Sequence, residues 1–203
     1  MKKIGNLEKA IEFAKTGFIN KLLEDLKTDN GNIKIVPSEY MDCYEEIQIA
    51  ADLGEIESGK LFNFHNETIE KYIIECKNKL IEESKTNLID GFLKYTNKIN
   101  FFIFWMNRIF CYLDRFYNKI NKTSLSKKEM ELYKSIFFEE FKDKIQEEIN
   151  KIKTEGNNEN DELNTKYKNI MKIIKEMELK DPVIFRDNYG TKEIKWIENK
   201  KNY

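Results

Sequence analysis

The chain has 203 residues, of which 40% are hydrophobic and 35% are charged, and it contains only 8 glycines and 2 prolines. So few turn-forming residues exclude the many short connections of an all-β fold and favour a helical protein of one large or two small domains. The 35 basic and 36 acidic side chains leave a net charge of -1. That balance gives no overall field to attract polyanions, so neither nucleic acid nor an anionic membrane is an expected partner.

The cysteines indicate a reducing compartment. Cys43, Cys76 and Cys111 are far apart, and each lies in an apolar helical pattern, which is typical of buried free thiols. Residues 1–25 are charged throughout and contain no signal-peptide core, and no stretch supplies the roughly 20 apolar residues of a membrane span. We therefore expect a soluble intracellular protein, cytoplasmic or nuclear.

The first helix is expected between residues 7 and 26, where apolar residues recur with charged residues between them. They are Leu7, Ile11, Phe18, Leu22 and Leu26. A turn follows at residues 29–32, and a second helix is expected from Pro37, with Ser38 as its N-cap and Gly54 as its stop.

One face of this second helix carries aromatic and aliphatic residues: Tyr40, Tyr44, Ile47 and Ala51, bordered by Met41 and Gln48. Two tyrosines one turn apart bring large apolar area with a polar tip. They can be half-buried core residues whose hydroxyls reach water, or they can form a contact ridge for another protein. The pattern leaves both interpretations open.

Residues 62–68, FNFHNET, are predicted to form a loop before a helix over residues 69–80. This loop holds the only histidine, His65. Because no cysteine or carboxylate stands near it at metal-ligand spacing, His65 is expected to be a surface or capping residue rather than a catalytic one. A further helix is expected from Leu88, bending near residues 95–100 into the most apolar segment of the chain.

That central segment, residues 99–120, carries two neighbouring apolar stripes. The first comprises Phe102, Met106, Ile109, Leu113, Phe116 and Ile120, and the second Phe101, Trp105, Arg108 and Tyr112. Together they form a wider face than one neighbouring helix would cover. Either the rest of the chain wraps this helix, or part of the face binds another protein, since Trp, Tyr and Arg are typical interface anchors.

Beyond a polar connection at residues 118–124, a capping box is predicted at Ser126–Glu129, with an apolar stripe running to Ile152. The clearest boundary is residues 156–161, followed by a helix over 163–177 that ends before Asp181-Pro182. The tail, residues 183–203, is apolar enough that we expect it to pack.

No sequence motif indicates catalysis. The chain has no Gly-rich phosphate loop, nucleophile elbow or paired Cys or His ligands. Acidic pairs such as Glu45-Glu46 are adjacent in sequence and therefore point to different sides of a helix. We predict no catalytic, cofactor-binding or metal-ligating residues.

The run WMNRIFCYLDRFY, Trp105 to Tyr117, resembles the fifth helix of the first repeat of the cullin family, and YMDCY, Tyr40 to Tyr44, resembles its second helix. Gly59 to Phe62 is similar to the third helix, and Leu163 to Met177 to the opening of a second repeat. The resemblance covers roughly residues 7–180. It implies an all-α, cullin-repeat-like bundle of about five helices followed by the start of a second helical repeat. We assign residues 1–154 to the first repeat, 155–161 to a linker and 162–203 to a partial second repeat with its tail.

The resemblance, closest to the cullins that bind Skp adaptors, also implies a function. Such a segment is a non-catalytic scaffold module of a cullin-RING-type ubiquitin ligase that docks a Skp-type or BTB-type substrate adaptor through its second and fifth helices. The family's adaptor-binding positions fall on Tyr40, Tyr44, Ile47, Gln48, Trp105, Asn107, Arg108 and Tyr112. The RING subunit is not expected to bind this segment. The alternative is a stand-alone α-helical interaction domain unrelated to ubiquitin ligation.

Overall fold

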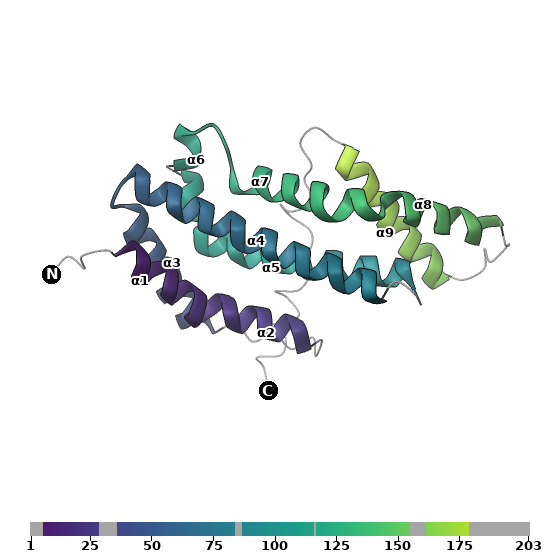
Figure 1. Cartoon of the computed structure of the whole chain (residues 1–203), viewed down its shortest axis with the longest axis horizontal. Helices are drawn as coiled ribbons and strands as arrows, with labels where there is room; N and C mark the ends of the chain where they lie inside the picture. The colour runs from purple at the N-terminus through teal and green to yellow at the C-terminus, as the bar shows by residue number, and fades with distance from the viewer. Residues whose placement is uncertain (1–5, 29–35, 84–86, 116, 155–160, 179–203) are drawn as a thin grey trace.

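A computed structural model describes residues 6–28, 36–83, 87–115, 117–154 and 161–178. Within these ranges the chain is helical, with short turns and no strand, so the all-α prediction is confirmed. Two long helices, α4 (Glu55–Glu83) and α5 (Leu88–Arg115), run antiparallel through the middle of the molecule (Figure 1).

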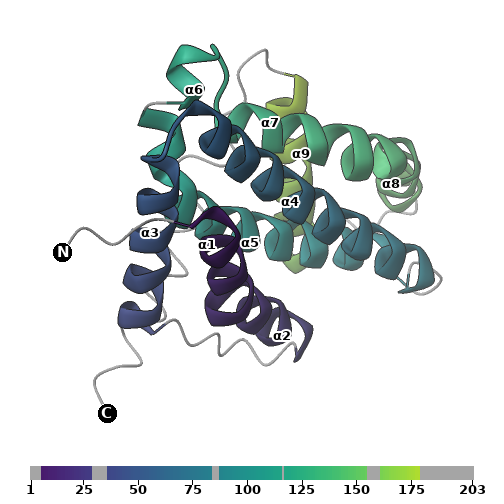
Figure 2. The same cartoon turned by 60° about the vertical axis from the view of Figure 1, so that its left-hand side comes forward.

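Shorter helices lie on two sides of this central pair (Figure 1). On one side are α1 (Leu7–Ala14), the π-helical turn η1 (Lys15–Ile19), α2 (Asn20–Thr28) and α3 (Pro37–Ala51). On the other are α6 (Tyr117–Ile120), α7 (Leu125–Leu132), the π-helical turn η2 (Tyr133–Phe138), α8 (Glu139–Thr154) and α9 (Asp161–Glu178). Figure 2 brings α3 forward, with α1 beside it and α5 behind it.

Helix α5 forms the core, as its apolar pattern predicts. Phe102, Met106, Ile109 and Leu113 on the first stripe are all buried. On the second stripe Phe101 and Trp105 are each 7% exposed, and the Trp105 ring lies 6.0 Å from the rings of both Phe18 and Tyr40. The chain itself therefore covers this part of the wide apolar face.

A second aromatic cluster attaches η2 and α8 to α5. The buried Phe137 ring stacks on Phe92 and on Tyr133, with 5.5 Å between ring centres in each pair, and lies 5.3 Å from Phe141. The Tyr133 and Thr96 hydroxyls are hydrogen-bonded at 2.9 Å. This pairing satisfies two polar atoms that burial would otherwise leave without partners.

The helix ends differ in detail from the sequence prediction. Val36, and not Ser38, is the N-cap of α3, because Pro37 occupies the first turn, where its missing N–H costs nothing. Helix α3 stops at Ala51, and Gly54 turns the chain into α4 with φ of 154°, a value that other residues rarely adopt. For α7 the cap is Ser124, whose Oγ accepts a hydrogen bond from the Lys127 N–H at 3.0 Å.

Two helices continue through segments that were predicted to be a loop or a bend. Residues 62–68 are not a loop but part of α4, and α5 passes through residues 95–100 as one helix. Because α5 ends at Arg115, Ile120 leaves the predicted core stripe and is 68% exposed on α6. The predicted turn at 29–32, the linker residues 155–160, Phe116 and the tail from residue 179 lie outside the described residues.

Helix α9, expected from the pattern over 163–177, packs against α5. The Lys134 ammonium donates a hydrogen bond to the Met177 carbonyl at 3.0 Å, and Lys166 forms an ion pair with Asp90 at 2.9 Å. The helix assigned from sequence to a partial second repeat is therefore attached to the first bundle.

Candidate protein-docking site

The packed pair α3 and α5 carries a set of partly or fully exposed side chains, here called the tyrosine ridge: Tyr40, Tyr44, Gln48, Arg108 and Tyr112. Helix α3 packs on α5 because Cys43, Ile47 and Ala50 turn one of its faces into the core. Its tyrosines, next to that face, are half-buried. Arg108 is exposed. The tyrosines are therefore half-buried, as the first interpretation expects, and their role as a contact ridge for another protein stays a prediction.

Tyr40 connects the ridge to the core beneath it. Its ring meets Phe18 and Trp105 edge to face at 6.4 Å and 6.0 Å, and its hydroxyl donates a hydrogen bond to the Arg108 carbonyl at 3.5 Å. Burial raises the pKa of the Tyr40 phenol, the Cys111 thiol adds to this effect, and the Arg108 guanidinium opposes it. Tyr40 therefore stays neutral and fixes α3 against α5.

Tyr112 is held in a defined orientation at the surface. Its hydroxyl donates a hydrogen bond of 2.5 Å to the Asp52 carboxylate at the end of α3. This bond raises the pKa of the Tyr112 phenol, the Tyr44 phenol also raises it, and Arg115 opposes the rise. Tyr44 on α3 and Tyr112 on α5 are each partly exposed, so neither ring is sealed inside the molecule.

Arg108 lies on an aromatic support. Its guanidinium carbon is 4.6 Å from the centre of the Phe104 ring and 5.5 Å from that of Trp105. Such cation–π contacts hold a long side chain in place while its hydrogen-bond donors face solvent. The arginine is thereby pre-organised for a partner.

The other predicted positions do not reach the surface of the ridge. Ile47 is 0% exposed and Trp105 only 7%, so both support the ridge from below. The Asn107 amide donates a hydrogen bond of 2.9 Å to Glu129 on α7, on the far side of α5. Ile47 and Trp105 are thus buried and Asn107 is partly exposed, while the assignment of these three positions to adaptor contact stays a prediction.

A hollow of about 270 Å³ opens at the Tyr112 end of the ridge. It is lined by Ala51, Asp52, Gly54, Glu55, Ser58, Tyr112, Leu113, Tyr117 and Ile120. The nearby exposed fractions are high for apolar side chains, with Leu53 at 47%, Ile56 at 71% and Ile120 at 68%. Sequence analysis missed this hollow, because it forms only where the ends of α3 and α5 meet the starts of α4 and α6.

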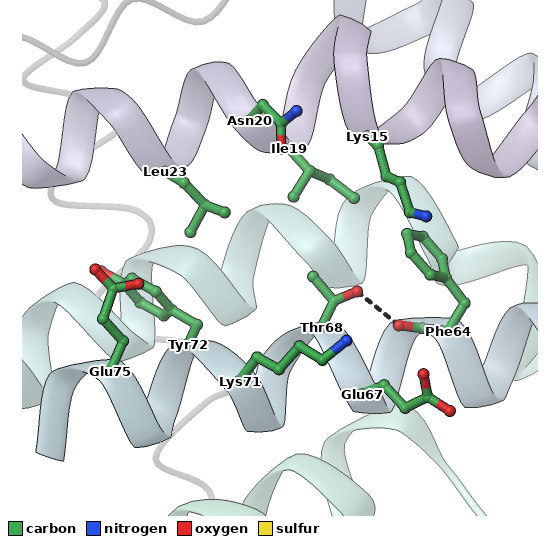
Figure 3. A pocket seen from close by; sticks show the side chains of 10 residues that line it. All are labelled: Lys15, Ile19, Asn20, Leu23, Phe64, Glu67, Thr68, Lys71, Tyr72 and Glu75. Atoms are coloured by element: carbon green, nitrogen blue, oxygen red, sulfur yellow. Dashed lines mark hydrogen bonds between the residues drawn. The ribbon is translucent and has the colours of Figure 1, made fainter. Parts of the chain in front are cut away.

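A second hollow, about 280 Å³, lies between the α1–α2 segment and α4 (Figure 3). Ile19, Leu23 and Phe64 give it apolar walls, and Lys15, Lys71, Glu67 and Glu75 place both charge signs around it. The Thr68 hydroxyl already donates to the Phe64 carbonyl at 2.7 Å. Charges of mixed sign with no convergent set of polar groups do not define a ligand, so the tyrosine ridge is the stronger candidate site.

His65, predicted as a surface or capping residue, is instead buried in the middle of α4. Its Nε2 faces the Glu129 Oε1 at 3.2 Å, and both side chains are 0% exposed. The prediction was wrong because residues 62–68 continue α4 across the core. A sealed pair of this kind joins α4 to α7 and is closed to substrates.

The described residues contain no group of three or more His, Cys, Asp or Glu side chains placed to hold a metal ion. Nor does any helix in the described ranges have the length and apolar character needed to cross a bilayer. Within the described residues the protein is an all-α bundle with a sealed histidine and an aromatic ridge at its surface, which is the architecture of a helical scaffold.

Comparison with known families matches residues 20–197 to the cullin alpha solenoid domain. The chain belongs to the cullin family. No curated protein and no solved structure gives a significant match to it. Cullin domains are non-catalytic scaffolds of ubiquitin ligases, which agrees with the class that the fold defines.

Proposed function

We propose that this chain docks a Skp-type or BTB-type substrate adaptor on its tyrosine ridge and acts as the adaptor-binding module of a cullin-type ubiquitin ligase. The observation that supports this most directly is that α3 packs on α5 with Tyr44 and Tyr112 both partly exposed, and that Tyr112 on α5 donates its hydroxyl to Asp52 at the end of α3. These helices carry the two segments whose sequences resemble the adaptor-binding helices of the family.

The ridge has the composition of an interface anchor. Tyrosine and arginine contribute strongly to binding when a partner removes them from water, since each has a large apolar surface and a polar end. Here Asp52 holds the Tyr112 hydroxyl and Phe104 supports the Arg108 guanidinium, so binding orders few additional rotamers. The adjoining hollow could receive an apolar side chain of the adaptor.

The test is titration calorimetry with recombinant Skp-type and BTB-type adaptors encoded in the same genome as this chain. Tyr44→Ala and Tyr112→Lys should each weaken adaptor binding about 30-fold or more, since truncating a buried anchor costs ~2 kcal/mol or more. Far-ultraviolet circular dichroism should remain unchanged, because both rings are only partly buried.

Tyr167→Ala is the matched control, because Tyr167 lies on α9 outside the ridge. This variant should bind adaptor as the wild type does. The proposal is overturned if neither adaptor type binds the wild-type chain, or if both ridge variants keep wild-type affinity.

A further inference from the structure

The two sides of the tyrosine ridge carry opposite charge. Helix α3 contains Glu39, Asp42, Glu45 and Glu46 and no lysine or arginine, and the chain continues with Asp52, Glu55 and Glu57. Glu39 lies toward α2, where it pairs with Lys21 at 2.5 Å. Asp42, Glu45, Asp52 and Glu55 are exposed. The outer side of α3 is therefore an acidic stripe.

The side of α5 next to the ridge carries two arginines, while the exposed Asp114 on the same helix accepts hydrogen bonds from the Asn118 amide and the Leu125 N–H. Arg108 and Arg115 are both exposed and stand seven positions apart, which places them on one helix face two turns from each other. Cys111 lies between them, and both guanidinium groups counter the rise that burial causes in the pKa of its thiol. Phe104 extends the same face by one turn.

The aromatic residues of the ridge lie between these two stripes. At the end of α3, the Asp52 carboxylate accepts the hydrogen bond of Tyr112. On the other side, Arg108 presents its backbone carbonyl to Tyr40, and Arg115 lies close enough to affect the pKa of Tyr112. A partner that covers the tyrosines must therefore also cover both charge stripes.

We propose that charge fixes the orientation in which the adaptor binds: its contact surface carries basic residues where it covers α3 and acidic residues where it covers α5. This inference rests on the proposed function and adds to it the chemistry of the partner. Apolar contact alone is non-directional. An interface with a positive half and a negative half instead disfavours the reversed orientation by placing like charges together, and it accelerates association in the correct one.

The sharpest test exchanges the stripes without changing net charge. In the double variant Glu45→Lys with Arg115→Glu, α3 gains a positive charge and α5 a negative one. The matched control is Glu70→Lys with Lys71→Glu, two exposed residues of α4 away from the ridge, which also keeps the net charge. Association of each chain with the recombinant adaptor that binds the wild type is measured by stopped-flow fluorescence at several salt concentrations.

The stripe exchange should lower the association rate constant about tenfold or more at low salt, and the difference should shrink as salt screens the charges. The control should associate like the wild type at every salt concentration. If the exchanged chain associates like the wild type while Tyr112→Lys still abolishes binding, the charge inference is wrong and the docking site stands. If the wild-type chain binds no adaptor, both proposals fall.

Discussion

Removing the Glu129 carboxylate should destabilise the whole bundle, because this side chain joins three helices inside the core. Its Oε1 faces the His65 Nε2 on α4 at 3.2 Å, and its Oε2 accepts a hydrogen bond of 2.9 Å from Asn107 on α5. The side chains of Glu129 and His65 are both 0% exposed. No water can replace the lost partner without entering the core.

The expected magnitude follows from that burial. Removing a buried polar partner costs roughly 1–3 kcal/mol, because the groups that faced it are left unsatisfied. Glu129→Ala should therefore lower the free energy of unfolding by about this amount. For a chain of this size the corresponding fall in Tm is on the order of 2–12 °C.

The assay is urea denaturation at pH 7 followed by circular dichroism at 222 nm. Glu131→Ala is the matched control on the same helix, since Glu131 is exposed and forms only a surface ion pair with Lys128 at 3.3 Å. That pair should contribute about 0–1 kcal/mol. Replacing both members, with Glu129→Leu and His65→Leu, should recover part of the lost stability, because His65 is no longer left without its partner and only the Asn107 amide loses an acceptor.

Equal effects of Glu129→Ala and Glu131→Ala would refute this reasoning. The reasoning would also be refuted if the loss of stability of the Glu129→Leu, His65→Leu double variant, measured against the wild type, equalled the sum of the losses of the two single variants. Either result would mean that the close approach of His65 and Glu129 makes no contribution to the folded state.

Two further predictions concern the second aromatic cluster and the thiols. Phe137→Ala should lower the free energy of unfolding by about 3–5 kcal/mol, because the fully buried Phe137 ring contacts Phe92, Tyr133 and Phe141. Thermal or urea unfolding measures this loss, and a loss below about 1 kcal/mol would contradict the packing. Burial raises the pKa of Cys43 and of Cys76 to about 12. Both thiols should therefore react with a disulfide reagent at pH 8 only after denaturation. Rapid labelling of the native chain would contradict their burial. Because these raised pKa values favour the neutral thiols in the folded state, the stability that they contribute should be full below pH ~9 and should be lost as the pH rises toward about 12.

The helices were predictable where apolar residues recur at a constant spacing. The periodicity of residues 7–26 predicted the segment that forms α1, η1 and α2, and that of residues 163–177 predicted α9. The apolar density of residues 99–113 identified α5 as the core helix. The π-helical turns η1 and η2 left no signal in these patterns, because one extra residue in a turn shifts the stripe only slightly.

The errors share one cause, which is that polar residues were expected to lie in loops or at caps. His65 and its polar neighbours suggested a loop, and Glu129 suggested a capping box with Ser126. In the folded protein His65 and Glu129 face each other inside the core, and each makes the burial of the other acceptable. No local pattern could reveal this pairing, because the two residues are far apart in the chain.

The all-α class, the identity of the core helix and the resemblance to the cullin family could be read from the amino-acid sequence, because these depend on spacing and residue type within single segments. Which of the predicted adaptor positions are exposed became clear from the packing of the helices. Tyr44, Arg108 and Tyr112 reach the surface while Ile47 is covered, since the exposure of a helix face depends on what the rest of the chain packs against it. The opposite charges beside the ridge likewise become neighbours only when α3 packs on α5.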